Sequence, residues 1–218
     1  MIGKGKSISH GVAALEYDLA KEINGQAVAT EIARHELYGC TGAEMVQEMK
    51  PYHIDFPNVK NNCLRFEVSP SIEESATFTD ADWAELGNDF MQRMGLANHQ
   101  YIIIRHSGTE SKKEQAHLHI LANRVSLSGE LYRDNWIGKK ATEAANAIAK
   151  ERNFVQSQDI GKVNKAEIKE AMDGVLKKMQ GFDFTKFKEE LGKRGFKVRE
   201  ARASTGKLNG YSVTARSG

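Results

Sequence analysis

Two short apolar runs near the middle of the chain, 101–106 and 117–125, indicate β-strands. A period of two is typical of β-strands, because successive side chains in a strand point to opposite faces of the sheet. The polar connection between the two segments predicts that they form neighbouring strands. In that arrangement His117 and His119 lie on one face, and His106 ends the other strand on the same side. The sequence therefore predicts a patch of sheet on which three imidazoles converge.

Helical spacing of apolar residues predicts helices on either side of these strands. The clearest helix spans 79–94, where a threonine and an aspartate three residues apart form a capping box and a glycine follows the last turn. A helix is also expected at 9–23, and a half-buried strand at 63–71. Together these elements predict an α+β fold. We expect an antiparallel β-sheet with helices packed on one face and the metal or active site on the other, plus a small helical and hairpin C-terminal region.

The composition is that of an ordinary globular protein. The 218 residues, 40% hydrophobic and 28% charged, can hold one sizeable core or a core with a small appendage. No segment reaches the ~18 consecutive apolar residues of a membrane span, and the N-terminus lacks the apolar part of a signal peptide. We therefore expect a cytoplasmic protein without a membrane segment. The two cysteines, Cys40 and Cys63, lack the spacing of a zinc knuckle and are expected to be reduced thiols.

The net charge of +2 conceals a division of the chain. Residues 1–137 carry 13 Lys and Arg against 19 Asp and Glu, whereas residues 138–218 carry 18 against 10. Such asymmetry suggests an anionic partner for the basic part, and nucleic acid is the first candidate. The sequence thus predicts a core at 1–137 and a basic, DNA-binding region at 138–218. The candidate DNA-binding residues are Lys193, Arg194, Lys197, Arg199, Arg202 and Lys207.

Three imidazoles on one face form a metal-binding pattern, because neutral imidazole is the commonest nitrogen ligand in proteins. The alternative is a structural histidine pair, partly buried beside a loop. The third histidine, at the end of the neighbouring strand, favours the metal site. Glu110, in the connection between the strands, is a candidate partner that would fix the tautomer of an imidazole; a solvated side chain is the alternative.

The segments FEVSP, FTDADWAELGNDFMQRMG, QYIIIRH and HLHILANRV together resemble the relaxase and mobilisation nucleases of conjugative plasmids and mobilisable transposons. The pattern of His106 followed by His117-x-His119 is similar to the ligand set of the wider His-hydrophobe-His (HUH) nuclease class. The resemblance extends to the helix that carries Tyr17 and to the basic C-terminal segment, and so covers most of the chain. Full-length relaxases usually continue into a second domain, so we expect the native protein to continue beyond residue 218.

The resemblance implies an endonuclease that nicks one DNA strand at an origin of transfer by transesterification, leaving a 5′-phosphotyrosyl linkage and a free 3′-OH. It implies that Tyr17 is the nucleophile, since the family places this tyrosine on an N-terminal helix that passes over the histidine patch. Tyr38 and His10 are the alternatives. A divalent ion on the three histidines would polarise the scissile phosphate. The family implies Mg²⁺ or Mn²⁺, whereas imidazole ligands generally prefer softer ions such as Zn²⁺ or Ni²⁺.

Two further residues have candidate roles near the histidines. Family members often carry a histidine or a differently placed acid in the strand that here contains Arg65 and Glu67. This departure leaves a catalytic role for Glu67 open. Asn123 stands at the motif's usual Asn position, where it would orient a ligand or phosphate, or make a strand-end hydrogen bond instead.

The implied substrate is single-stranded DNA beside an inverted repeat at the origin of transfer, with accessory mobilisation and coupling proteins as further partners. Affinity should fall steeply with salt, because the basic region would contact the phosphate backbone. Two other functions remain open. One is a rolling-circle replication initiator of the same superfamily, and the other is a non-catalytic DNA-binding module with structural histidines. A DNA adduct that survives denaturation would separate the last of these from the two enzymes.

Overall fold

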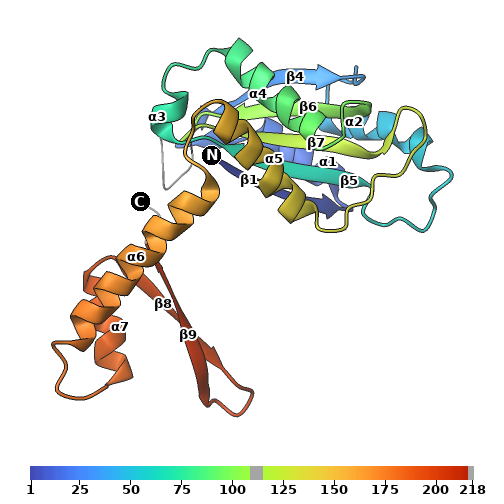
Figure 1. Cartoon of the computed structure of the whole chain (residues 1–218). Coiled ribbons are helices and arrows are strands. Elements are labelled where there is room, and N and C mark those ends of the chain that lie inside the picture. The colour runs from blue at the N-terminus through green and yellow to red at the C-terminus, as the bar shows by residue number, and fades with distance from the viewer. Residues whose placement is uncertain (109–114, 216–218) are drawn as a thin grey trace. The chain divides into compact units, whose positions relative to one another are not determined.

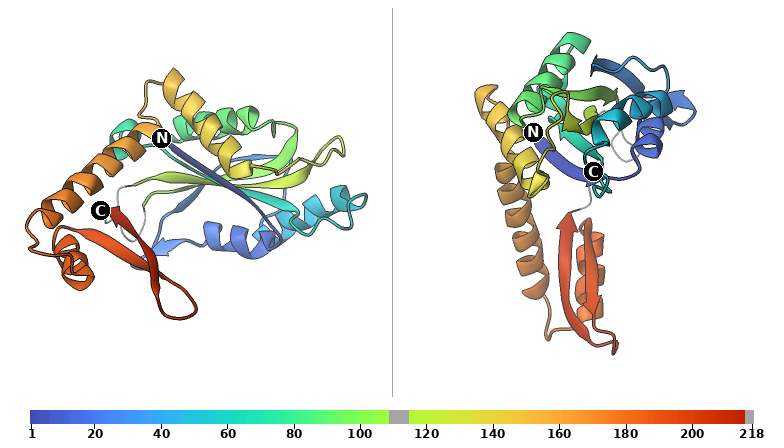
Figure 2. Two further views of the ribbon diagram at one scale, coloured as in Figure 1. Left: turned by 60° about the horizontal axis from the view of Figure 1, so that its bottom comes forward. Right: turned by 90° about the vertical axis from the view of Figure 1, so that its right-hand side faces the viewer.

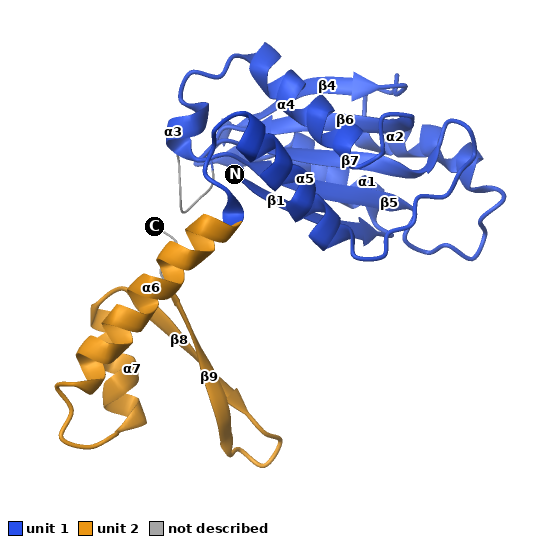
Figure 3. Ribbon diagram, in the orientation of Figure 1, with its two compact units in different colours: residues 1–157 blue, residues 158–218 orange. Residues whose placement is uncertain are grey.

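The computed structural model describes residues 1–108 and 115–215, and the chain divides into two compact units, Met1–Ser157 and Gln158–Gly218 (Figure 3). The expected boundary after residue 137 falls inside the first unit. Helix α5 (Ile137–Glu151) packs on strand β1 (Ile2–Ile8), and this long-range contact keeps α5 with the core. Within the described residues, no helix combines the length and apolar character needed to cross a membrane.

The first unit is built on a five-stranded antiparallel sheet (Figure 1). Its strand order is β1-β5-β7-β6-β4, so the two strands predicted to be neighbours, β6 and β7, are paired near its centre. Besides β1, the sheet contains β4 (Ala29–His35), β5 (Cys63–Ser69), β6 (His99–His106) and β7 (His117–Ser126). A small hairpin, β2 (Glu22–Ile23) and β3 (Gln26–Ala27), lies outside this sheet. The predicted α+β fold with an antiparallel sheet is confirmed.

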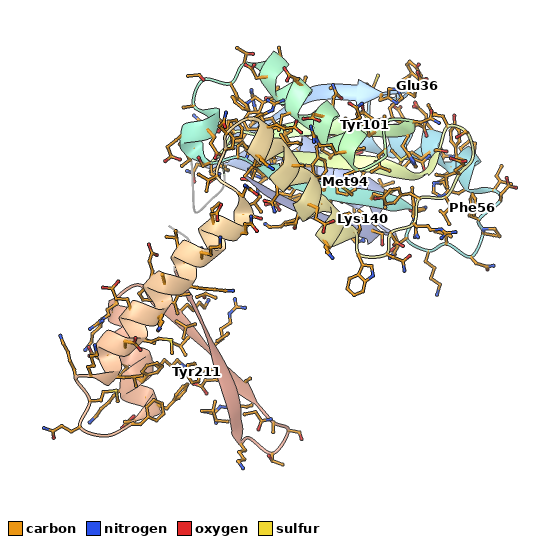
Figure 4. All side chains as sticks on the ribbon, viewed as in Figure 1. Glu36, Phe56, Met94, Tyr101, Lys140 and Tyr211 are labelled. Carbon is orange, nitrogen blue, oxygen red and sulfur yellow. The ribbon has the colours of Figure 1, made fainter. Side chains whose placement is uncertain are left out.

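One face of the sheet is covered by α5 and by α4 (Asp80–Arg93), which form a large apolar core with it (Figure 2). The capping box predicted at the start of α4 is present, and its buried stripe includes Trp83, Leu86 and Phe90. Tyr101 on β6 and Met94 after α4 belong to the same core (Figure 4). This face contains the apolar side chains that alternation assigned to it.

The opposite face is partly covered by two shorter helices, α1 (Gly11–Leu19) and α2 (Gly42–Met49) (Figure 2). Helices thus pack on both faces, and the histidine patch shares its face with α1. Helix α1 is shorter than expected, because the chain turns into β2 before Ile23. The buried residues of α1 are Gly11, Ala14, Leu15 and Asp18, a stripe that includes one acid.

Short helical segments α3 (Ile72–Ser75) and η1 (Lys50–His53) complete the connections of the first unit. The second unit contains α6 (Ser157–Leu176), α7 (Phe184–Lys193), β8 (Phe196–Arg202) and β9 (Leu208–Ala215). Residues 157–163 form the first turns of α6. The predicted hairpin is present, and Tyr211 on β9 packs against Phe187 of α7 (Figure 4). The core of this unit is small, comprising Ala171, Val175, Phe187, Leu191 and Val198.

Candidate metal centre

The three histidines come together at one end of the β6–β7 pair. His106 lies directly across from His117, and His119 lies across from Ile104, so strand pairing alone places all three on adjacent positions of one face. One ring nitrogen from each lies within 4.8 Å of the others. His106 and His117 are buried and His119 is half-buried. The convergence predicted from the alternation of residues is therefore present.

The donor atoms are spaced as ligands of one ion require. The Nε2 atoms of His117 and His119 are 3.1 Å apart, a separation that two nitrogens can adopt at ~2.1 Å from a common metal ion. The Nδ1 of His117 faces the carbonyl oxygen of Gln115, which can only accept, so this nitrogen carries the proton and Nε2 keeps its lone pair. The residues present thus fit a divalent cation held by three imidazoles.

Burial favours the neutral form, which binds metals, in His106 and His119. The pKa of His119 is lowered to about 2, first by burial. Electrostatic repulsion from His106 and His117, and then from Arg65 and Lys4, lowers it further. Burial also lowers the pKa of His106 below its usual range. Both imidazoles are therefore uncharged at neutral pH, ready to coordinate without first losing a proton.

Asp18, on the last turn of α1, contacts two of the three rings, and our reading of the sequence did not identify it. Its backbone carbonyl accepts a hydrogen bond from Nε2 of His106 at 2.7 Å. Its carboxylate pairs with Arg65, whose Nε is 3.1 Å away, and lies 3.8 Å from Nδ1 of His119. Burial raises the pKa of this carboxyl, and the bonds from Arg65 oppose that rise. An acid on the buried stripe of an amphipathic helix was the available signal.

Tyr17 precedes Asp18 and lies on the exposed side of α1. Its side chain is 56% exposed, and its hydroxyl accepts a hydrogen bond from Nζ of Lys21 at 2.8 Å. The two alternative nucleophiles are exposed as well. His10 is the N-cap residue of α1, and Tyr38 is 76% exposed and donates a hydrogen bond to Glu36 at 3.0 Å.

Of the other predicted residues, Glu67 lies next to His119, whereas Asn123 lies farther along β7. Glu67 lies across from His119 in the β5–β7 register and accepts a hydrogen bond from Lys4 at 2.9 Å. Asn123 is fully buried. Its amide binds His53, the carbonyl oxygen of Met49 and Gln100, and these bonds hold η1 and the end of α2 against the sheet. Glu110 lies outside the described residues.

The six basic candidates all belong to the second unit, where they have different partners. Lys197 and Arg199 alternate with buried Val198 and so share the outer face of the β8–β9 hairpin. Lys193 and Arg202 form ion pairs with Glu190 and Glu200. Arg194 donates to the carbonyl oxygen of Ala171, and Lys207 lies in the hairpin turn. Lys197 and Arg199 thus form the most open cationic pair of the set.

Comparison with known proteins identifies one family and two related structures. A family model described as relaxase, MobA/VirD2-like, nuclease domain matches residues 17–154, a range that includes Tyr17 and the three histidines. No curated protein matches the chain. Among solved structures, it is similar to two of the conjugative relaxase TrwC in complex with oriT DNA. The metal-bound structure shares 12% identity with a TM-score of 0.41, and the metal-free structure 10% with 0.42; each match covers 95% of this chain and 74% of the other.

Proposed function

We propose, because this chain belongs to the MobA/VirD2-like relaxase family of nucleases, that it nicks one DNA strand at an origin of transfer and remains bound to the new 5′ end. The observation that carries this proposal is the link between α1 and the histidine patch. Asp18 bonds to His106 and faces His119, so the backbone of the preceding residue, Tyr17, lies near the histidine patch. This supports Tyr17 as the nucleophile. A purely structural histidine cluster would not require a tyrosine at this position.

The proposed reaction is a transesterification. The phenol oxygen of Tyr17 attacks the scissile phosphorus, a P–O bond to Tyr17 forms, and the bond to the 3′ oxygen breaks. The phenol loses a proton and the 3′ oxygen gains one, so no water is consumed. The products are a 5′-phosphotyrosyl linkage and a free 3′-OH. Because one phosphodiester replaces another, the covalent linkage can later be transferred back to a 3′-OH.

His106, His117 and His119 would hold the divalent ion that the family implies. When bound, this ion supplies positive charge to polarise the scissile phosphate. The three uncharged ligands leave that charge undiminished, whereas carboxylate ligands would reduce it. Mg²⁺ or Mn²⁺ is the proposed physiological ion, and an all-imidazole donor set also accepts Zn²⁺ or Ni²⁺.

Other residues of the chain would orient the reacting groups. Asp18 and Gln115 fix two ring tautomers through their carbonyl oxygens, so these imidazoles present defined nitrogens to the centre. Lys21 holds the hydroxyl of Tyr17 by a hydrogen bond. In the second unit, the outer hairpin face with Lys197 and Arg199 would contact the phosphate backbone of single-stranded DNA. We propose a DNA-binding role for this C-terminal region on the same charge argument.

The proposal is tested by trapping the covalent adduct. The protein is incubated with Mn²⁺ and end-labelled single-stranded DNA that contains the origin, and the products are separated on a denaturing gel. We expect a labelled band at the mass of protein plus DNA. Tyr17→Phe should abolish this band while DNA binding is retained, and Tyr38→Phe, a matched change at another exposed tyrosine, should leave it intact. An adduct that persists in Tyr17→Phe would move the nucleophile to Tyr38 or His10.

Two other functions predict different outcomes in the same assay. A rolling-circle replication initiator would form the adduct on DNA from a replication origin and not on an origin of transfer. A DNA-binding module with structural histidines would bind both DNAs and form an adduct with neither. The family match favours the relaxase over both.

A further inference from the structure

A cavity of about 200 Å³ adjoins the histidine patch and has His119 in its wall. It is lined by residues from three adjacent strands, β1, β5 and β7: Lys4, Gly5, Lys6, Arg65, Phe66, Glu67 and His119. The sequence did not indicate this cavity, because its cationic walls come from β1 and β5, which are distant from each other in the chain. His119 belongs to both the cavity and the candidate metal centre, so a ligand in one lies next to the other.

The glycines of β1 direct its lysines into the cavity. Gly3 and Gly5 face α5, where an added Cβ would collide with the carbonyl of Ala141 or lie 2.8 Å from the ring of Phe66. Side chains alternate along a strand, so Lys4 and Lys6 project from the opposite face, on the side of the histidines. Because α5 packs closely on the face of Gly3 and Gly5, Lys4 and Lys6 lie on the opposite face of the sheet.

The cavity has more positive than negative charge on its walls. Arg65 is paired with Asp18, and Lys4, 64% exposed, is paired with Glu67 at 2.9 Å. Lys6 is exposed, and within residues 1–108 and 115–215 no ion pair joins it to an acid. Lys6 thus contributes positive charge with no counter-charge from an acid in that part of the chain. A cation of this kind beside a polar cavity suits an anionic ligand.

We infer that this cavity binds a phosphate group of single-stranded DNA that neighbours the phosphate attacked by Tyr17, with Lys6 as its main contact. This inference rests on the proposed function. The cavity is smaller than the ~300 Å³ at which pockets for whole small-molecule ligands begin, so a phosphate fits it better than a complete nucleotide. Adjacent strands lie ~4.8 Å apart, so β1 is about two strand spacings from His119 on β7. One DNA strand would therefore place one phosphate at the histidine patch and a neighbouring phosphate beside Lys6. Lys6 and Lys4 would hold the strand in register beside the histidines.

The test measures the salt dependence of DNA binding. Each lost phosphate contact to single-stranded DNA lowers the slope of log affinity against log salt by ~0.7. Binding of a fluorescent oligothymidylate is followed by anisotropy across a series of KCl concentrations, with EDTA present and Tyr17→Phe as the parent protein. We expect Lys6→Gln to reduce the slope by ~0.7 and to weaken binding at low salt. The matched control is Lys139→Gln on α5, a lysine 71% exposed and near Glu143, which should leave the slope unchanged.

Equal slopes for Lys6→Gln and Lys139→Gln would overturn the inference. A second arm separates DNA from free anions: inorganic phosphate is added at constant ionic strength. Displacement of DNA by millimolar phosphate from the parent but not from Lys6→Gln would support the inference, because both ligands would then compete for the cavity; equal displacement from both proteins would overturn it. The proposed function is judged separately by the adduct assay with Tyr17 present. Loss of the slope difference and loss of the adduct are therefore independent results.

Discussion

The two faces of the central sheet differ in the side chains that they bury. The face under α4 and α5 carries the larger of the two apolar clusters of the first unit. The face under α1 and α2 also has an apolar cluster, yet it buries Asp18, His106, His117 and Asn123 as well. Buried polar groups weaken a fold unless each is hydrogen-bonded, and those just named have partners. The comparison teaches that one face provides stability and the other places chemistry on a frame already stable.

The largest expected contrast comes from removing one ring from each face. Phe90→Ala, on the apolar face, should lower the free energy of unfolding by ~3–5 kcal/mol because it leaves a cavity in the core. His119→Ala should abolish the DNA adduct in the gel assay and remove one ligand of the centre, with a much smaller loss of stability in urea titration. The comparison fails if Phe90→Ala unfolds no more easily than His119→Ala.

A smaller effect is expected at Asp18, whose carboxylate lies 3.8 Å from Nδ1 of His119 and would position this ring without being a ligand. Asp18→Asn should weaken Mn²⁺ binding by ~10–100-fold, the usual cost of losing a partner that positions a metal ligand. Titration calorimetry on the DNA-free protein measures this directly. Asp134→Asn is the matched control, since Asp134 also pairs with an arginine, Arg124 at 2.7 Å, away from the histidines. Similar Mn²⁺ affinities in both variants would show that the carboxylate of Asp18 has no role in the centre, because the substitution keeps the bond from the backbone carbonyl to His106.

The smallest expected effect concerns the face of the sheet under α1 and α2. It tests how far reagents from solvent can reach a buried thiol on this face, away from the histidines. Cys63 lies buried in the cluster under α1, and burial raises its pKa to about 12, whereas Cys40 is exposed. Because thiolates are the reactive form, a disulfide reagent at pH 8 should modify one thiol in the folded protein and two in denaturant. Cys40→Ser should then show no rapid reaction. Fast modification of both thiols in the native protein would show that this face opens readily.

The strands, the main helices and the meeting of the three histidines were predictable from sequence, because each follows from local periodicity. His106 and His119 needed only the face assignment and the pairing of two consecutive strands. Asp18 was not found, since its role arises from the docking of α1 on a sheet whose strands β5 and β7 are formed much later in the chain. The cavity beside Lys6 was missed for the same reason. The position of α5 likewise depends on its long-range contact with β1, which the distribution of charges along the chain does not reveal.

Asp18 and Tyr17 are consecutive residues of one short helix, and the carbonyl of Asp18 is bonded to His106. Any tilt or unwinding of α1 that carried the tyrosine away would break this bond and release an imidazole. In the proposed reaction, a covalently captured DNA end would therefore be tethered to the same turn that bonds to His106. If α1 were exchanged for that of another relaxase, the transplant would have to carry both residues together, because neither is independent of the other.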